Sequence, residues 1–459
     1  MRVRFRSGLV ILGLAAVLGA PPAAAQDTVA ADRGVRIGIT YTPGLRPGVL
    51  VLGGKHSEVL DSARAILLRD LDYSDRFELI SLPGGDSLAV GLLSPGAAGP
   101  RPTATGTHAA ALELFVNYPL YAALGADYAV NVTRNDTTGA LGATVYDVRG
   151  QTARRQLPIP TGSAADPAFR LSVHRVSDEV VRVAAGTAGI AATRLVFIQH
   201  GRAYQVDADG AGVTAVTPEG TTALSPGWEP SGHRLVYTDF KAGLGRLYLL
   251  DLRTGERRLV PPTSQFLNYT AAFSPDGATL AFSRSSEEGT DIYTYNLASD
   301  CCLQRLTVGR FSDNLSPTFS PDGRRIAFVS NRPGLPQIYV MAADGTGQEL
   351  FAPFDYGVTG SSNAPEWSPD GLSVAFHRDV AGSPQIFVMD VASRRVRQLT
   401  SAGRNEDPTW APDGRHLAFV SDRTGSRQIW IIDLDTGRVR QVTRIGEARL
   451  PAWSQRIGP

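Results

Sequence analysis

The second half of the chain repeats one pattern of hydrophobic and polar positions six times. Each copy opens with an aromatic residue, usually followed by Ser-Pro-Asp-Gly, and continues with a short run of apolar residues. The aromatic openers are Trp228, Phe273, Phe319, Trp367, Trp410 and Trp453. A period of about 40–50 residues is typical of β-propeller blades with four strands each. The pattern therefore predicts an all-β, six-bladed β-propeller.

Turn residues support this prediction. In Ser274–Gly277, proline presets the backbone angle of a turn, aspartate can bond its own backbone, and glycine supplies positive φ. The alternating apolar and aromatic residues after each turn indicate strands. Residues 195–217 resemble the last three strands of a blade without an opener, whereas Pro451–Ser454 is an opener without strands. We expect these segments to share one blade, which closes the ring by the C-terminal strand.

A different pattern precedes the repeats and predicts a small α/β domain over residues 48–186, with the propeller over 187–459. Its expected strands cover 48–52, 77–81, 128–133 and 143–148, and its expected helices cover 57–71, 109–124 and 168–185. Residues 83–107 are rich in Gly, Pro, Ala and Thr, which predicts a flexible insertion. Residues 26–47 are expected to form a mobile N-terminal segment.

The first 25 residues have the form of a cleaved export signal. Arg2, Arg4 and Arg6 precede an apolar run, and Ala23–Ala25 fits a cleavage site. The alternative is an uncleaved anchor, although the run is short for a membrane helix. Without the signal the chain has 42 basic residues, which is 45 minus 3, and 44 acidic residues. This balance gives no reason to expect nucleic acid or an anionic membrane as partner.

Signals for catalysis and metal binding are weak. The chain has no nucleophile elbow, zinc-protease motif, P-loop or dinucleotide fingerprint. His233 and His416 follow the turns directly, so we expect them to face solvent. Asp207–Gly210 is similar to the start of a calcium loop, but its twelfth position is Pro218, and we expect a hairpin turn. We therefore predict no enzymatic activity, cofactor or metal.

Cys301 and Cys302 are the only cysteines and are adjacent in the sequence. Consecutive Cα atoms lie about 3.8 Å apart, which is below the usual range for a disulfide. Two alternatives stay open: a vicinal disulfide, or two inert thiols.

The exported α/β domain followed by these repeats resembles the TolB family, the periplasmic components of the Tol-Pal system. The resemblance also includes Val35–Ile37, Tyr121–Asp127, Ser177–Val180 and Pro451–Ser454. It implies a monomeric, non-enzymatic periplasmic adaptor that binds the lipoprotein Pal through the propeller and TolA through an N-terminal segment. The family supports outer-membrane integrity and envelope constriction during cell division. The alternatives are a propeller scaffold for another envelope protein or glycan, and an enzyme. We do not expect an attached hydrolase domain of a few hundred residues, because only six residues follow Trp453.

Carried onto this chain, the resemblance gives two sets of partner-binding residues. The TolA segment would be Val35, Arg36, Ile37, Gly38, Ile39 and Thr40, whose alternation suits the addition of a strand to a sheet edge. Alternatively, this segment pairs within its own domain. The Pal-binding residues would line one mouth of the propeller: Asn268, Asn314, Asn363, Glu366, Asn405 and Glu406. Of these, Glu366 and Glu406 are expected on exposed loops. Their alternative role is turn capping. Ser316 stands where the resemblance suggests a glutamate.

Overall fold

The computed structural model describes residues 46–53, 56–81, 116–135, 137–163, 165–241, 244–261, 266–354 and 360–458. These residues belong to one compact unit. The predicted signal, the segment Val35–Thr40 and the insertion 83–107 lie outside the described residues. Among the helices of the described part, none has the length and apolar character needed to span a membrane.

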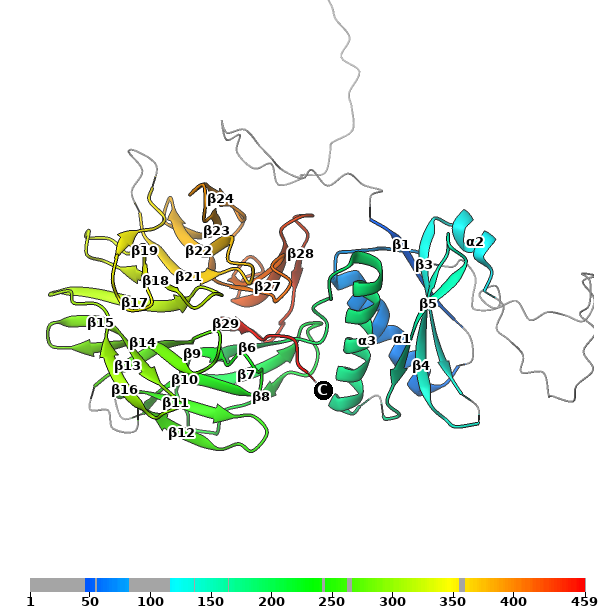
Figure 1. Ribbon diagram of the computed structural model, residues 1–459, viewed down its shortest axis with the longest axis horizontal. Helices are drawn as coiled ribbons and strands as arrows, with labels where there is room; N and C mark the ends of the chain where they lie inside the picture. The colour runs from blue at the N-terminus through cyan, green and yellow to red at the C-terminus, as the bar shows by residue number, and fades with distance from the viewer. Residues whose placement is uncertain are drawn as a thin grey trace, which may run out of the picture. The chain divides into compact units, whose positions relative to one another are not determined.

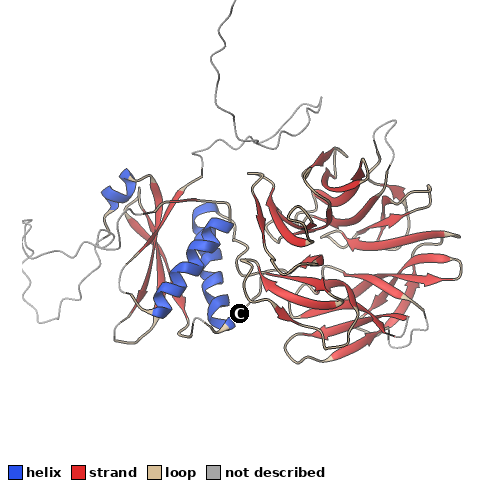
Figure 2. Ribbon diagram, turned by 180° about the vertical axis from the view of Figure 1, so that it is seen from behind, coloured by secondary structure: helices blue, strands red, loops and turns tan. Residues whose placement is uncertain are grey.

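The N-terminal part is a five-stranded sheet with helices (Figures 1 and 2). The strand order is β2-β1-β3-β4-β5, with β1 parallel to both neighbours and β3, β4 and β5 antiparallel. The elements are β1 (Gly48–Leu52), α1 (Glu58–Tyr73), β2 (Glu78–Leu79), α2 (Tyr118–Ala123), β3 (Ala126–Arg134), β4 (Leu141–Asp147), β5 (Thr152–Ile159) and α3 (Pro167–Ala185). The predicted strand at 77–81 is thus only two residues long, and residues 152–159 form an additional strand.

Strand β1 is buried on both faces of this sheet. Val49 packs in one apolar cluster with helices α1 and α3, whereas Leu50 and Leu52 pack in another with Tyr121 of α2. This follows from the alternation of side chains along a strand. Figure 2 shows α1 and α3 side by side along one face of the sheet.

Local signals set the ends of the two long helices. The Ser57 side chain accepts a hydrogen bond from the backbone N of Leu60 and so caps α1. Asp166 caps α3 in the same way, with Pro167 in its first turn, and the helix ends at Gly186 in the left-handed conformation, with φ of +78°.

The rest of the described chain consists of β-strands. They are β6 (Arg194–Gln199), β7 (Arg202–Asp207), β8 (Thr214–Ala215), β9 (Ala223–Trp228), β10 (Arg234–Lys241), β11 (Leu244–Asp251), β12 (Arg257–Val260), β13 (Asn268–Phe273), β14 (Thr279–Ser286), β15 (Gly289–Asn296), β16 (Cys301–Arg305), β17 (Ser312–Phe319), β18 (Arg325–Ser330), β19 (Gln337–Ala342), β20 (Glu349–Leu350), β21 (Ser362–Trp367), β22 (Ser373–Val380), β23 (Ser383–Asp390), β24 (Val396–Gln398), β25 (Asn405–Trp410), β26 (His416–Ser421), β27 (Gln428–Asp433), β28 (Val439–Gln441) and β29 (Arg449–Trp453).

These strands form a β-propeller. Four of its sheets have four strands each: β9–β12, β21–β24, β25–β28, and β29 with β6–β8. The last sheet confirms the predicted closure, because β29 pairs antiparallel with β6. The prediction of six separate blades needs a correction. Strands β13–β20 form one eight-stranded sheet, because the start of β17 at Ser312 pairs in parallel with Gly289 of β15.

The Ser-Pro-Asp-Gly turns behave as predicted. In the turn after β13, the hydroxyl of Ser274 donates to Asp276 at 2.5 Å and accepts from the backbone N of Thr279 at 2.9 Å. Gly277 has φ of +71°. The same bonds recur in the turns that begin at Ser320 and Ser368. Each turn thereby sets the register of the strand that follows it.

Candidate functional site

The inner strands of the propeller contact one another in a closed cycle. Strands β9, β13, β17, β21, β25 and β29 each touch the next, and β29 touches β9. We call the starts of these strands, together with the loops that precede them, the rim. The predicted Pal-binding residues lie in or next to the rim, so the rim is the first candidate site.

Each inner strand carries a β-bulge near its start. The pairing register shifts at this point in all six strands. One non-glycine residue per strand has a left-handed backbone with φ between +47° and +52°: Ser225, Thr270, Ser316, Ala364, Asp407 and Leu450. This conformation costs energy for a residue with a Cβ, and bulges are common beside functional sites. The bulge and its left-handed residue therefore recur in every repeat and shape the rim.

Three of the predicted residues are not exposed. Asn268, Asn314 and Asn405 are fully buried at the starts of their strands. The Asn314 amide donates to Asp291 at 3.1 Å and accepts from Arg332 at 3.0 Å. These three asparagines are therefore not surface residues, and Asp291 and Arg332 occupy the Asn314 amide.

Asn405 repeats the arrangement of Asn314 in another sheet. It donates to Gln385 at 2.8 Å and accepts from Arg423 at 3.0 Å. In both places the arginine also lies over an aromatic pair, with the Arg423 guanidinium 4.9 Å from the Trp430 ring centre. These asparagines therefore tie the inner strand to the arginine beside it.

Glu366 also lies in a strand rather than on an exposed loop. Its carboxylate accepts from the backbone N of Trp410 at 3.0 Å and from the Thr409 hydroxyl at 3.1 Å, both in β25. Burial raises the pKa of Glu366 to about 7, although these hydrogen bonds act in the opposite direction. Glu366 therefore connects β21 to β25.

Asn363 and Glu406 are, like Glu366, partly exposed. Glu406 lies 3.3 Å from Arg404. The neighbouring Asp407 was not predicted, and its backbone N donates to His377 at 3.1 Å. Burial raises the pKa of Asp407, against the opposing charge of His377. Asp407 lies three residues before the opener Trp410. The same position recurs three residues before every opener, and this constant spacing was a signal in the sequence.

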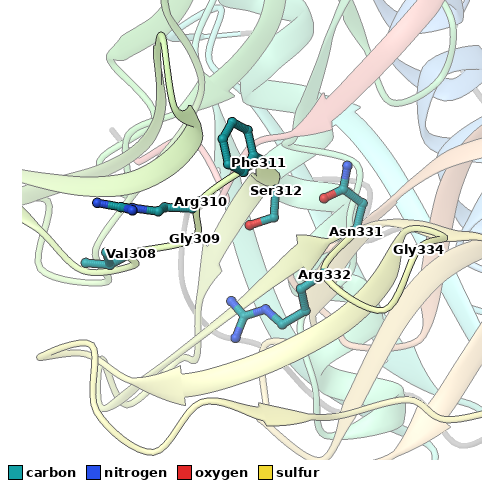
Figure 3. A pocket seen from close by; sticks show the side chains of 8 residues that line it. All are labelled: Val308, Gly309, Arg310, Phe311, Ser312, Asn331, Arg332 and Gly334. Atoms are coloured by element: carbon teal, nitrogen blue, oxygen red, sulfur yellow. The ribbon is translucent and has the colours of Figure 1, made fainter.

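A hollow of about 540 Å³ opens in the rim beside β17 (Figure 3). Val308, Arg310 and Phe311 come from the loop before β17, whereas Asn331 and Arg332 come from the loop after β18. Phe311 is 89% exposed and Val308 is 77% exposed. Sequence reasoning missed both, although two apolar residues in a loop of Gly, Arg and Ser were a visible signal.

The backbone holds Phe311 in its exposed position. Its φ is +59°, and its N–H donates to the carbonyl of Glu288 at 2.7 Å. Exposed aromatic residues in a surface hollow are typical anchors for a protein partner. Phe311 is therefore the strongest partner-binding candidate in the described part of the rim.

The second candidate site lies where helices α1 and α3 contact the propeller. Asp70 of α1 accepts from His174 of α3 at 2.8 Å and from the Ser177 hydroxyl at 2.7 Å. Beside them, Asp209 of the propeller pairs with Arg170 at 2.8 Å. Burial by itself lowers the pKa of His174, but the carboxylates around it, chiefly Asp70, outweigh burial and raise that pKa.

His416 forms a similar cluster and contradicts its prediction. It is fully buried, with Nδ1 2.7 Å from Asp413 and Nε2 3.2 Å from Asp433 and 3.5 Å from Asp75. The expectation of solvent exposure is wrong, because the turn after α1 brings Asp75 onto the imidazole. Burial alone lowers the pKa of His416, but the carboxylates outweigh it and raise the pKa to about 9. His416 is therefore charged at neutral pH.

Each cluster places three possible metal ligands within 4.8 Å: Asp70, His174 and Asp209 in one, and Asp75, His416 and Asp433 in the other. Arginines already contact three of these carboxylates. Arg170 binds Asp209 at 2.8 Å, Arg438 binds Asp75 at 3.2 Å, and Arg415 pairs with Asp433. A divalent cation would have to compete with these guanidinium groups. The donor sets therefore fit protonated imidazoles better than a metal ion.

The structure also shows the two cysteines and the turn that is similar to a calcium loop. Cys301 and Cys302 form a disulfide, which is one of the two alternatives. Asp207–Gly210 is a hairpin turn as predicted, closed by the N–H of Gly210 on the carbonyl of Asp207 at 2.8 Å. The prediction missed that Asp209 in this turn also binds arginines of α1 and α3.

The chain is similar to known proteins in both sequence and fold. A family model described as the TolB beta propeller domain matches residues 182–353 and 356–457. The curated Tol-Pal system proteins TolB of Bordetella pertussis and Bordetella parapertussis are each 29% identical over 210 residues, 44% of this chain and 47% of theirs. The chain thus matches about half the length of these relatives. The crystal structure of TolB from Acinetobacter baumannii has the same fold, with a TM-score of 0.71, 22% identity, and coverage of 89% of this chain and 97% of that one.

Proposed function

This chain belongs to the TolB β-propeller family, and we propose that it is a non-enzymatic periplasmic adaptor of the Tol-Pal system. In this proposal it binds the lipoprotein Pal through the propeller and TolA through the N-terminal segment. It acts as a monomer in maintaining outer-membrane integrity and in envelope constriction during cell division.

The proposal includes a finer description of the chain. We interpret the eight-stranded sheet as two blades, which with the four separate sheets gives a six-bladed propeller. The chain divides into a signal over residues 1–25, an N-terminal segment over 26–47, an α/β domain over 48–186 and the propeller over 187–459. Val35–Thr40 stays the proposed TolA-binding segment on the basis of the resemblance alone.

The observation that carries Pal binding is the exposed apolar pair in the rim. Phe311 and Val308 expose most of their side chains beside the hollow that Arg310 and Arg332 also line. A few central aromatic residues usually dominate the energy of a protein interface. We therefore assign the anchor for Pal to Phe311, with the rim residues Glu406 and Asn363 as further contacts.

Calorimetric titration of the mature protein, residues 26–459, with soluble Pal from the same genome tests the proposal. We expect saturable one-to-one binding, and we expect Phe311→Ser to weaken it by at least about 2 kcal/mol. Leu372→Ser is the matched control, because Leu372 is 64% exposed and lies beyond the opposite end of an inner strand. It should bind like the unmodified protein.

The outcomes separate the proposal from its main alternative. Equal affinities of the two variants would move the Pal contact away from Phe311. A folded protein that gives no heat and no complex with Pal would instead favour a scaffold for another envelope protein or a glycan.

A further inference from the structure

We propose that the α/β part docks onto the propeller through a detachable electrostatic latch. Asp72 and Asp75, beside the C-terminal end of α1, form its acidic half, and Arg438 forms its basic half. This inference concerns how the molecule is held together and does not depend on the proposed partners.

The latch has a dense set of polar contacts. Arg438 lies between β27 and β28, and its guanidinium binds the Asp72 carboxylate at 2.8 Å and the Asp75 carboxylate at 3.2 Å. It also donates to the backbone carbonyl of Asp72 at 3.1 Å. Arg415 donates to the carbonyl of Asp75 at 3.1 Å, and His416 lies 3.5 Å from the Asp75 carboxylate.

A second set of contacts has the opposite polarity. Here the helices supply the bases, since Arg69 of α1 and Arg170 of α3 bind Asp209 of the propeller at 3.2 and 2.8 Å. Arg170 also lies 3.6 Å from Asp207. Because acid faces base at one point and base faces acid at the other, only one docking orientation satisfies both sets.

The described residues place no apolar core between the two parts. The buried clusters of the α/β part contain residues between Val49 and Val181 only. The cluster of the neighbouring propeller sheets begins at Ile190, in the connecting segment. Neighbouring propeller sheets, in contrast, share apolar clusters, as Phe197 and Ile429 do. An interface without a large apolar core is expected to permit relative motion.

The connecting segment has the features of a hinge. It starts at Gly186, whose left-handed backbone ends α3. Its N–H groups at Ala191 and Ala192 donate to the buried Asp178 at 2.7 and 3.0 Å, and the side chain of Arg456 donates to the carbonyl of Gly189. The Asp178 contacts tie Ala191 and Ala192 to α3, whereas Ile190 between the two parts is buried in the propeller cluster. Undocking should therefore release these two N–H groups and make them accessible to solvent exchange.

Salt provides the first test. The screening length falls from about 10 Å at 0.1 M to about 3 Å at 1 M. We therefore expect hydrogen–deuterium exchange in residues 186–193 of the mature protein to accelerate with added sodium chloride. Exchange in the apolar propeller strands should stay constant. Linker exchange that is independent of salt would overturn the proposal.

Charge exchange provides the second test. Arg438→Glu should accelerate linker exchange about fivefold at low salt, because an exposed ion pair contributes up to about 1 kcal/mol. The double variant Asp72→Arg, Arg438→Glu should slow linker exchange part of the way back to the original rate, because the new pair re-forms at Asp72 while position 438 still faces the Asp75 carboxylate. The control is Arg394→Glu, which breaks another 2.8 Å ion pair of similar exposure, with Glu349 inside the propeller.

The pattern among these variants decides the second test. A double variant that exchanges as fast as Arg438→Glu, or a control that exchanges equally fast, would refute the latch. Melting temperatures of all three variants establish that the propeller is folded, and the salt series on the unmodified protein keeps the test valid if one variant misfolds.

Discussion

The burial of His416 leads to a quantitative prediction about stability and pH. Its imidazole faces Asp413 and Asp433 of its own sheet and Asp75 of the turn after α1. Its pKa rises from 6.5 to about 9 in the folded protein. The folded state therefore holds a proton that the unfolded chain releases at lower pH. The resulting stabilisation is complete below pH 6.5 and is lost as the pH rises through about 9.

The size of this effect follows from the pKa shift. The rise of the His416 pKa from 6.5 to about 9 corresponds to roughly 3 kcal/mol, since a tenfold change in proton affinity is worth about 1.36 kcal/mol. Urea unfolding of the mature protein at several pH values between 6.5 and 10 measures it. We expect the free energy of unfolding to fall by roughly this amount, and His416→Gln to remove most of the pH dependence.

His233→Gln is the matched control, because His233 also follows the turn after an inner strand, here β9, and is only half-buried. It should keep the pH dependence of the unmodified protein. If His416→Gln and the unmodified protein lose stability in parallel up to pH 10, then His416 is not the group that holds the proton, and the reasoning from its carboxylate neighbours fails.

Two further predictions test the corrected roles of rim residues. Glu366→Gln keeps an acceptor for Trp410 and Thr409 but removes a carboxyl whose pKa is raised to about 7. The native carboxyl loses its stabilising protonation as the pH rises from 4.5 through 7, so the variant should gain melting temperature relative to the native protein at pH 8 and little at pH 5; equal differences at both pH values would contradict this. Asn314→Ala leaves Asp291 and Arg332 without their amide partner and should cost about 1–3 kcal/mol in urea unfolding, whereas an unchanged stability would show that the amide is not structural.

The repeat pattern was sufficient to predict much of the fold. Ser-Pro-Asp-Gly turns fix their own hydrogen bonds within six residues, as Ser274, Asp276 and Thr279 do, so their geometry follows from local sequence. The closing sheet was predictable because β29 supplies the one strand that β6–β8 lack. The joined sheet β13–β20 was not, because the pairing of Gly289 with Ser312 depends on how two repeats lie against each other.

The candidate sites were less predictable, for physical reasons that individual residues illustrate. The asparagines before the openers were identified by position, but Asn314 and Asn405 are each held inside the fold by an arginine 18 residues later, Arg332 and Arg423, which local sequence does not bring together. The apolar pair Val308 and Phe311 in a polar loop was visible in the sequence, but whether such a side chain is exposed depends on what packs against the loop in the folded protein.

The surroundings of His416 show which contacts follow from local sequence and which form only when the chain folds. Local sequence placed His416 directly after a turn, and there Ala411 replaces the serine that bonds the turn aspartate elsewhere, so that Asp413 is available to the imidazole. The contact with Asp75, more than 300 residues earlier in the chain, arises only when the α/β part packs on the propeller. Turns and strand registers depend on neighbours in sequence, which the chain encodes directly. The charge of a buried group depends on every carboxylate and guanidinium that folding brings within a few ångströms, and only the tertiary structure decides which these are.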